Sequence, residues 1–266
     1  MAHDVWAAGD AYEAYVGRWS RLVAAAFLSW LDVPPGRCWL DVGCGTGALT
    51  AAVLAEASPA AVVGVDPSAG FVASARFSVP RAGFVVGDAQ ALPLPGGYAD
   101  VSVSGLALNF VPDPGRAVVE FARVTAPGGV VAAYVWDYAE GMGMMRAFWD
   151  AAVALDPAAA ALDEGQRFPL CRPEPLARLW ASAGLDDVTV RPLDVPTVFA
   201  GFDDYWRPFL GGQGPAPGYA MSLSEERRLA LRELLRSRLP DGTIARTARA
   251  WAVRGTVGST VEGSVR

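Results

Sequence analysis

A strand that ends in an acid and runs directly into three glycines is the feature that most limits how this chain folds. Residues 39–50 read Trp-Leu-Asp-Val-Gly-Cys-Gly-Thr-Gly-Ala-Leu-Thr, so an apolar run ends at Asp41 and a small-residue helix follows the turn. The glycines are Gly43, Gly45 and Gly47. Because glycine has no Cβ, such a turn folds tightly and lets a bound molecule approach the backbone. This position, at the carboxyl end of a strand, is where open α/β sheets bind nucleotides.

Two later strands also end in an aspartate. The segments Ala61–Asp66 and Ala82–Asp88 are apolar up to their last residue. Because the carboxyl ends of parallel strands meet at one edge of a sheet, we expect Asp41, Asp66 and Asp88 to share that edge. Asp66 follows the glycine turn by roughly 20 residues, which is where nucleotide-binding folds place the carboxylate that binds ribose hydroxyls. Three acids favour a cationic or hydroxyl-rich ligand over a diphosphate, and the Gly-x-Gly-x-Gly spacing departs from the NAD fingerprint.

These motifs resemble those of the class I S-adenosylmethionine-dependent methyltransferases, in particular the small-molecule branch near the ubiquinone and menaquinone biosynthesis type. The similar segments follow one another in the family's order: Asp41–Gly47, Val65–Ser68, Gly87–Ala89, Tyr98–Ser104 and Phe121–Gly129. The first segment resembles the loop that packs against the methionine part of the cofactor. The similarity as a whole extends over roughly residues 12–137 of the chain.

The resemblance implies S-adenosyl-L-methionine as the cofactor. It implies that Asp66 holds the ribose diol and that Asp88 lies near the adenine amino group. Arg18 belongs to a segment that lies over the cofactor in similar methyltransferases, and its guanidinium fork suits the cofactor's carboxylate. The alternative for Arg18 is a surface arginine without a ligand. The cofactor-binding residues expected in this way are Arg18, Asp41, Gly43, Gly45, Asp66, Asp88 and Ala89.

The alternation of strand and helix patterns predicts a single α/β domain over residues 1–257, with a loose tail at 258–266. We expect a Rossmann-like, seven-stranded, mostly parallel sheet with helices on both faces. The strands are expected near 38–42, 61–66, 82–88, 99–104, 129–136, 187–195 and 247–257. In the fold that the chain resembles, the last two strands form a hairpin and the last strand is antiparallel.

Helices and insertions complete the expected domain. Apolar residues at steps of three and four predict an N-terminal helix over 10–32. Two stretches outside the strand–helix rhythm, 138–172 and 196–245, are expected to be lid insertions over the cofactor face. The capping-box spacing of Ser222 and Glu225 predicts that a charged helix begins there.

Acceptor-side residues are expected at strand ends and in the insertions. Asn109 follows the fourth strand, where many relatives carry a histidine-containing stretch, and asparagine cannot act as a base. Asp137 ends the fifth strand and is a general base, a hydrogen-bond acceptor or a solvated strand-end carboxylate. Tyr205 and Trp206 lie in an aromatic segment that forms either a wall for the acceptor or the packing of the lid.

Composition excludes several other chemistries. All 22 basic residues are arginines and the only histidine is His3, which excludes a lysine Schiff base, a P-loop lysine and an internal histidine base. A net charge of −6 argues against nucleic acid as a partner. Cys38, Cys44 and Cys171 lack metal-site spacing, so we expect no metal and reduced thiols in the cytoplasm. We also expect neither a signal peptide nor a membrane span.

Two classes of function remain. The first is a methyltransferase acting on a small, aromatic or apolar molecule, and the second is a non-catalytic S-adenosylmethionine-binding or regulatory module. Methyl transfer is an in-line displacement, so positioning alone contributes about 7–11 kcal/mol to catalysis. A base is needed only if the acceptor must lose a proton. The sequence does not determine the acceptor, the atom that is methylated or the oligomeric state.

Overall fold

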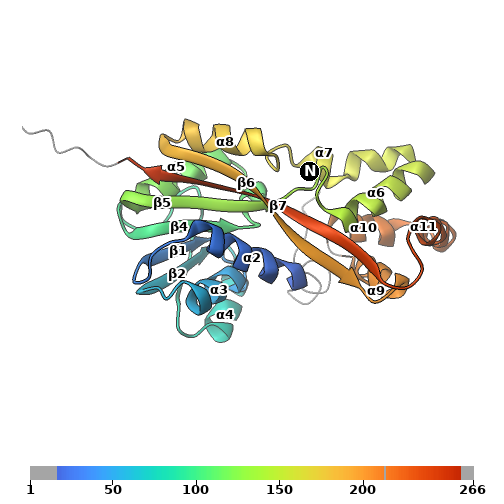
Figure 1. The fold of residues 1–266 in the computed structure, drawn as a ribbon, viewed down its shortest axis with the longest axis horizontal. Coiled ribbons are helices and arrows are strands. Elements are labelled where there is room, and N and C mark those ends of the chain that lie inside the picture. Colours follow the sequence, from blue (N-terminus) through green and yellow to red (C-terminus); the bar gives the residue numbers. More distant parts are fainter. Residues whose placement is uncertain (1–16, 213, 259–266) are drawn as a thin grey trace, which may run out of the picture. The chain divides into compact units, whose positions relative to one another are not determined.

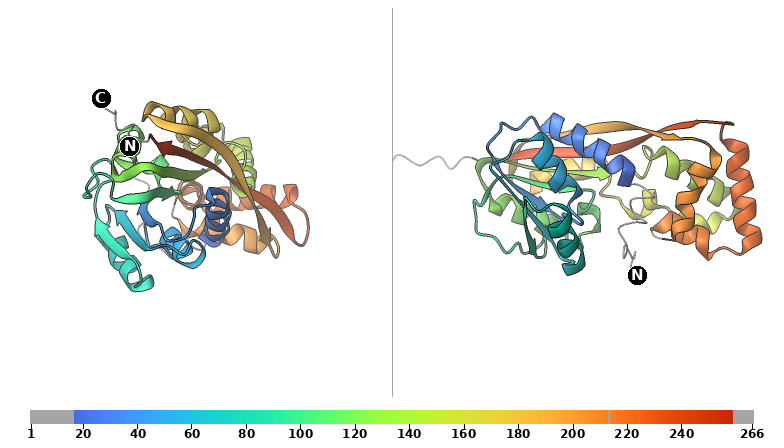
Figure 2. Two further views of the ribbon diagram at one scale, coloured as in Figure 1. Left: turned by 60° about the vertical axis from the view of Figure 1, so that its left-hand side comes forward. Right: turned by 90° about the horizontal axis from the view of Figure 1, so that it is seen from below.

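The computed structural model describes residues 17–212 and 214–258 and divides into two compact units. The first, here called the sheet unit, contains the described residues 24–135, 172–193 and 251–258. The second, here called the helical unit, contains the described residues 17–23, 136–171, 194–212 and 214–250. Figures 1 and 2 show the elements of both.

Seven strands form one sheet in the order β3-β2-β1-β4-β5-β7-β6. The strands are β1 (Cys38–Val42), β2 (Ala61–Asp66), β3 (Gly83–Val86), β4 (Ala99–Gly105), β5 (Thr125–Trp136), β6 (Leu185–Phe199) and β7 (Ile244–Val257). The pairings from β3 through to β5 are all parallel. β7 runs in the opposite direction to β6 (Figure 1). The predicted seven-stranded, mostly parallel sheet with an antiparallel last strand is therefore confirmed.

The strands differ from the prediction mainly at their ends. β3 ends at Val86, earlier than predicted, because the chain then turns so that Asp88 bridges to Ala91. β6 is longer than predicted and lies at an edge of the sheet. It contains Pro192 and Pro196. An edge strand tolerates proline because on its open side there is no neighbouring strand to which a backbone N–H would donate.

Helices of the sheet unit cover both faces of the sheet. They are α3 (Ala48–Glu56), α4 (Ala69–Ser78), α5 (Pro114–Val124) and α8 (Pro173–Ser182). α3 and α4 lie on one side, and α5 and α8 lie on the other (Figures 1 and 2). α5 begins with Pro114 in its first turn, and the Asp113 carboxylate accepts a hydrogen bond from the Arg116 amide at 3.0 Å.

The helical unit contains most of the two stretches that were expected to be lid insertions. Its helices are α6 (Gly143–Leu155), α7 (Glu164–Arg167), α9 (Phe202–Trp206), α10 (Pro215–Ser222) and α11 (Glu225–Arg238), with 3-10 turns at Pro157–Leu162 and Arg207–Gly211. Aromatic rings form its core. Phe148 of α6 stacks on Phe209 at a centroid distance of 4.4 Å, and both rings are fully buried.

The predicted capping box before α11 is wrong. Ser224 is the N-cap, and its hydroxyl oxygen accepts a hydrogen bond from the amide of Arg227 at 3.3 Å. Ser222 is the last residue of α10, and its hydroxyl donates to the carbonyl of Tyr219. Ser222 and Ser224 are two positions apart, and only Ser224 has the extended backbone conformation of an N-cap residue.

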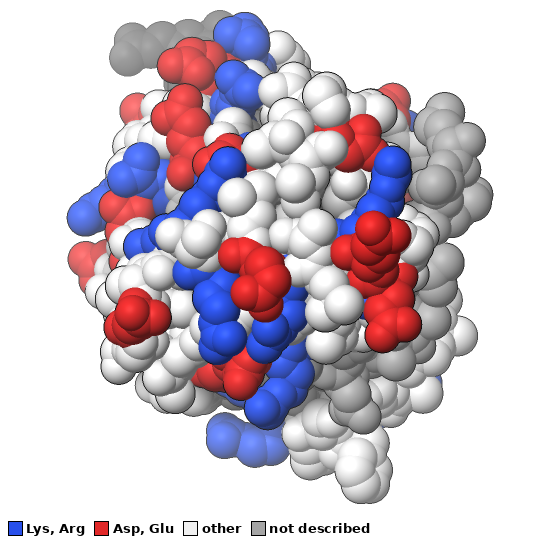
Figure 3. All heavy atoms as spheres, turned by 90° about the vertical axis from the view of Figure 1, so that its right-hand side faces the viewer, with Lys and Arg blue, Asp and Glu red and all other residues white. Residues whose placement is uncertain are grey.

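The described residues begin at 17 and end at 258, so two sequence predictions are only partly covered. The N-terminal helix α2 (Arg18–Leu31) ends where the sequence predicts, while residues 10–16 of the predicted helix and residues 259–266 of the predicted tail lie outside the described residues. Within 17–212 and 214–258, no helix has both the length and the apolar character that crossing a bilayer requires. On the face in Figure 3, arginine and acidic side chains alternate without a large area of one sign.

Candidate functional site

The glycine turn joins β1 to α3 at the carboxyl edge of the sheet. The φ angles of Gly43, Gly45 and Gly47 are +73°, +53° and +92°, a region that favours glycine. A Cβ atom added to Gly43 would lie 2.5 Å from the Cβ of Ala107, whereas one added to Gly45 would have no neighbour within 4 Å. The turn is therefore packed against the protein at Gly43 and open at Gly45.

Asp66 connects the end of β2 to this turn. One carboxylate oxygen accepts a hydrogen bond from the backbone amide of Gly45 at 2.9 Å, and the other accepts from the amide of Ser68 at 2.8 Å. A carboxylate oxygen accepts more than one hydrogen bond, so each still has an acceptor position for a ligand hydroxyl. Asp66 thus shapes the glycine turn as well as offering oxygens at its edge, and the sequence analysis missed the first of these roles.

Asp41 is a buried carboxyl group with one unsatisfied oxygen. Its Oδ2 accepts a hydrogen bond from the hydroxyl of Thr50 at 2.7 Å, while Oδ1 is buried without a partner among the described residues. Burial raises the pKa of Asp41 to about 7, against the opposing effect of the Thr50 hydrogen bonds. An unsatisfied buried acceptor costs about 1–3 kcal/mol. A cationic donor beside Oδ1 would remove that cost and favour the ionised form.

Asp88 is exposed beyond β3, and Gln90 holds its carboxylate. The backbone amide of Gln90 donates to Oδ1 of Asp88 at 2.9 Å, and its side-chain amide donates to both oxygens at 3.1 and 3.2 Å. These hydrogen bonds lower the pKa of Asp88. Ala89, between them, is buried. The sequence analysis missed Gln90, although its place two residues after Asp88 is a usual spacing for such a turn.

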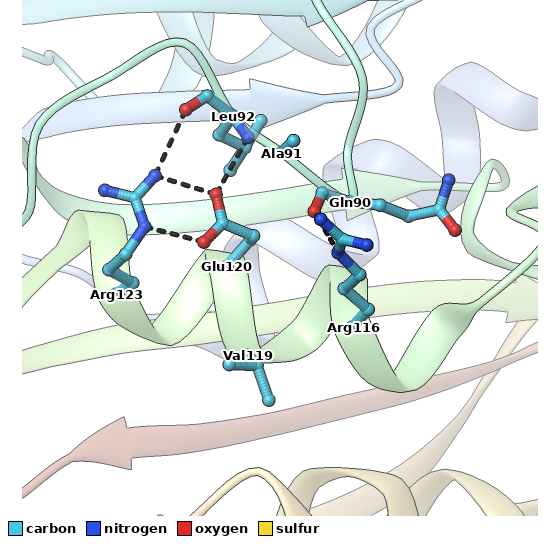
Figure 4. A pocket seen from close by; sticks show the side chains of 7 residues that line it. All are labelled: Gln90, Ala91, Leu92, Arg116, Val119, Glu120 and Arg123. Carbon is cyan, nitrogen blue, oxygen red and sulfur yellow. Dashed lines mark hydrogen bonds and ion pairs between the residues drawn. The ribbon is translucent and has the colours of Figure 1, made fainter.

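A cavity of about 370 Å³ lies between the chain after Asp88 and the outer face of α5 (Figure 4). It is lined by Gln90, Ala91, Leu92, Arg116, Val119, Glu120 and Arg123. At one end, Glu120 accepts a hydrogen bond from the Leu92 amide at 2.8 Å, and Arg123 donates to the carbonyls of Leu92 and Leu94. At the other end, Nε of Arg116 donates to the Gln90 carbonyl at 2.8 Å. Both ends of the segment after Asp88 are therefore fixed to α5.

The turn after β4 adds a polar group beside the glycine turn. Leu106 has a φ angle of +58°, which is strained for a side chain other than glycine. Ala107 lies against Gly43, and Asn109 follows in a short 3-10 turn. Both amide atoms of Asn109 are buried without a partner among the described residues. Such an amide is a natural group for contacting a ligand.

Asp137 follows β5 in the helical unit. Its carboxylate is 3% exposed and accepts a hydrogen bond from the amide of Glu140 at 3.1 Å. The alternative of a solvated strand-end carboxylate is therefore wrong, because the turn from Asp137 to Gly141 folds back over the side chain. Burial, with a smaller contribution from the charge of Asp137, raises the pKa of Cys171 and keeps that thiol protonated.

Arg18 lies between aromatic rings of the helical unit. Its guanidinium carbon is 4.6 Å from the centroid of the Trp19 ring and 4.8 Å from that of Phe199. Its Nη1 atom is 3.5 Å from a carboxylate oxygen of Asp204. Nε and Nη2 are buried without a partner among the described residues. Arg18 is therefore a positioned, partly buried cation.

Tyr205 and Trp206 lie within the aromatic core of the same unit. Tyr205 is fully buried, and its hydroxyl donates to the carbonyl of Met144 at 2.8 Å. Trp206 is 5% exposed and stacks on Phe202 at an interplanar angle of 8°. In this conformation both side chains make packing contacts, as one of the two sequence alternatives expects.

Glu164 is a buried carboxyl group that the sequence analysis missed. It lies at the start of α7, where it accepts a hydrogen bond from the indole N–H of Trp149. Burial raises its pKa to about 7, and the neighbouring Asp163 adds to the shift. Asp163 is itself paired with Arg146. Both Asp163 and Glu164 are buried, and nothing in the local sequence signals the burial of Glu164.

Known proteins resemble both the motifs and the fold. Residues 40–133 match the methyltransferase domain family. The 2-methyl-6-phytyl-1,4-hydroquinone methyltransferase of Synechocystis is 32% identical over 187 residues, which are 68% of this chain and 57% of that protein. The demethylmenaquinone methyltransferase of Renibacterium salmoninarum is 37% identical over 112 residues, covering 42% and 45%. The chain thus spans about half the length of these relatives.

A solved structure extends the likeness to most of the fold. The phosphoethanolamine N-methyltransferase 2 of Haemonchus contortus, determined with S-adenosylhomocysteine, superposes with a TM-score of 0.59. The match covers 94% of this chain and 57% of that one at 17% identity. At this identity the likeness shows a shared fold.

Proposed function

The chain carries a class I S-adenosylmethionine-dependent methyltransferase domain, and from this premise we propose that the protein transfers a methyl group from S-adenosyl-L-methionine to a small molecule. The observation that carries the proposal is Oδ1 of Asp41, a buried acceptor without a partner among the described residues, beside a glycine turn that is open at Gly45. A ligand with a cationic amino group satisfies that oxygen, and S-adenosyl-L-methionine has one.

Each of the proposed cofactor-binding residues has a distinct role. Asp41 binds the amino group of the cofactor, and Gly43 and Gly45 let the backbone pass close to it. Asp66 accepts hydrogen bonds from the ribose hydroxyls with its remaining lone pairs. Asp88 accepts one from the adenine amino group, and buried Ala89 packs beside the ring. Arg18 of the helical unit pairs with the cofactor's carboxylate through its unpartnered Nε and Nη2.

The acceptor side is proposed from fewer observations. The unsatisfied amide of Asn109 orients the acceptor, and Tyr205 and Trp206 contact its apolar part. The bound sulfonium supplies the methyl group and the driving force. Asp137 is the proposed base where the acceptor must lose a proton. An aromatic or apolar acceptor is supported by the relative named for its action on a hydroquinone. The unpaired state of all three cysteines is consistent with a cytoplasmic location.

Two measurements test the proposal in order. Calorimetry with S-adenosylhomocysteine first asks whether the protein binds the cofactor, and an absence of binding contradicts the whole proposal. Incubation with isotopically labelled S-adenosyl-L-methionine and fractionated cell metabolites then asks whether label moves to an acceptor. Label transfer supports the methyltransferase. Binding without transfer to any fraction favours the non-catalytic binding module instead.

A further inference from the structure

Gln90 makes hydrogen bonds to three residues, Asp88, Asp113 and Arg116. Its backbone amide and its side-chain amide both donate to the Asp88 carboxylate. Its side-chain oxygen accepts a hydrogen bond from the amide of Asp113 at 3.1 Å, and its carbonyl accepts from Arg116. Because the two ends of the side-chain amide face opposite partners, its orientation is determined: nitrogen toward the carboxylate, oxygen toward Asp113.

This arrangement leaves the Asp88 carboxylate with one preferred direction for a ligand. Oδ1 accepts two hydrogen bonds from Gln90, whereas Oδ2 accepts one. A carboxylate oxygen has two lone pairs in its plane, so the vacant position belongs to Oδ2. The same hydrogen bonds keep Asp88 ionised, since they lower its pKa. An ionised carboxylate accepts hydrogen bonds and cannot donate them.

We propose that Gln90 is a positioning residue that aims Oδ2 of Asp88 at the 6-amino group of the cofactor's purine and thereby makes the site selective for adenine over a 6-oxopurine. The inference rests on the proposed function, because it assumes that Asp88 faces the purine. A 6-amino group donates to the fixed oxygen. A 6-oxo group places an acceptor against an acceptor, and a site built to hydrogen-bond a substrate N–H group discriminates against the analogue that lacks it.

The helix α5 holds Gln90 in place and also provides a matched control. Arg116 contacts Gln90 at one end of the cavity in Figure 4. Asp113, the N-cap residue of α5, also donates a hydrogen bond to Gln90. Glu120 and Arg123 contact Leu92 at the other end and make no hydrogen bond to Asp88 or Gln90. Loss of the Glu120 contacts therefore loosens the same segment without touching the positioned carboxylate.

The test compares two ligands on three variants. Binding of S-adenosylhomocysteine and of its deaminated analogue, S-inosylhomocysteine, is measured by calorimetry for the unsubstituted protein, Gln90→Leu, Gln90→Glu and the control Glu120→Gln. We expect the unsubstituted protein to prefer the adenosyl ligand by about ten-fold or more. In Gln90→Leu the preference falls by about ten-fold, chiefly through weaker adenosyl binding. In Glu120→Gln the thermal stability falls and the preference is unchanged.

Gln90→Glu keeps the size of the side chain and gives a second readout. The introduced carboxyl faces Asp88, and like charges raise the pKa of one member of such a pair. Adenosyl affinity, relative to the unsubstituted protein at each pH, is therefore low at pH 8 and recovers as the pH falls and the carboxyl pair gains a shared proton, which restores the donor. This variant also decides the matter if Gln90→Leu fails to fold.

The outcomes separate the two proposals. If the unsubstituted protein binds neither ligand, the proposed function is wrong. If it binds S-adenosylhomocysteine but Gln90→Leu weakens both ligands equally, or Gln90→Glu shows no recovery at low pH, Gln90 is only a structural residue and the inference is overturned.

Discussion

The carboxylate of Asp66 accepts a hydrogen bond from the backbone amide of Gly45 at 2.9 Å, so the acid at the end of β2 helps to set the conformation of the turn after β1. The residue assigned to the cofactor's ribose is thus also part of the frame of the site. A substitution there changes the shape of the glycine turn as well as the contact with the ligand.

Asp66→Ala is therefore expected to have two effects. The loss of hydrogen bonds from two backbone amides lowers the free energy of unfolding by about 1–3 kcal/mol, and affinity for S-adenosylhomocysteine falls at least about ten-fold. Denaturant unfolding and calorimetry measure the two. Asp100→Ala is the control. Asp100 accepts a hydrogen bond from the Cys38 amide at the start of β1, at the amino ends of the strands and away from the glycine turn. It should lose stability and keep its affinity; equal affinity in both variants would contradict the ribose assignment.

Gly45→Val is expected to abolish cofactor binding. The added side chain has room, since no atom lies within 4 Å of an added Cβ, but it occupies the space assigned to the ligand. The positive φ angle costs about 1–2 kcal/mol in addition. Gly36→Val provides a matched control, because Gly36 also has a positive φ angle and no neighbour within 4 Å but lies before β1. Both variants should lose similar stability in thermal melting. Normal binding by folded Gly45→Val would mean that the glycine turn is structural.

Cofactor affinity is expected to depend on the ionisation of Asp41. In the empty protein the pKa of this carboxyl is raised to about 7, so it is protonated in mildly acidic solution and attracts an amino group poorly. Affinity for S-adenosylhomocysteine should fall as pH decreases below about 7, by up to about ten-fold for each pH unit. Asp41→Asn should bind weakly with a flat pH profile between pH 5.5 and 8. A sloping profile in that variant would assign the titration to another group.

The buried carboxyl group of Glu164 is expected to make the stability of the protein depend on pH. Its pKa is raised from 4.5 to about 7 in the folded protein, so folding disfavours the charged form. Stability is full below pH 4.5 and falls as pH rises to about 7, by roughly 3 kcal/mol at most, then stays constant. Glu164→Gln keeps an oxygen for the Trp149 indole and removes this loss, so the variant is more stable than the unsubstituted protein at pH 8 and similar at pH 5. Denaturant midpoints at both pH values measure the difference; equal midpoints at pH 8 would show that the carboxylate is not buried in solution.

The segment around Trp206 is expected to respond to the acceptor. We predict that Trp206→Ala leaves affinity for S-adenosylhomocysteine nearly unchanged and sharply lowers turnover of the true acceptor. Hydrogen exchange over residues 200–212 should slow when an acceptor analogue is present together with the cofactor product. Phe148→Leu is the control, since Phe148 belongs to the same aromatic core: it should lower stability and leave turnover per folded molecule unchanged. Equal protection with and without the analogue would mean that the segment is fixed packing.

The sequence predicted the parts of the fold that are determined by neighbours along the chain. A strand, an acid and closely spaced glycines occur within a few residues at β1, so the turn and its position at the sheet edge follow from local rules. Neighbouring residues also define the start of α5, where Asp113 and Pro114 are adjacent. The start of α11 was wrong because Ser222 and Ser224 both satisfy a capping pattern, and only the backbone conformation chooses between them.

The missed parts depend on side chains that meet from separate elements. The hydrogen bond from Gly45 to Asp66 joins residues 21 positions apart, and Gln90 receives a hydrogen bond from Asp113, 23 positions away. Glu164 is buried because Trp149 of another helix presents its indole N–H there. Such pairs depend on how separate elements pack together, so a pattern of residue types along one element does not predict them.

The edge strand β6 also affects how copies of this protein can associate. Adding a strand from a second molecule to a sheet requires a regular row of exposed amide donors. β6 lacks a donor at Pro192 and again at Pro196, and between them the charged side chain of Asp194 is held by Arg249. At the other edge, β3 has only four residues, Gly83–Val86. Neither margin of the described sheet therefore presents a long regular row of amide donors, so both margins are poor templates for the addition of a strand from a second copy.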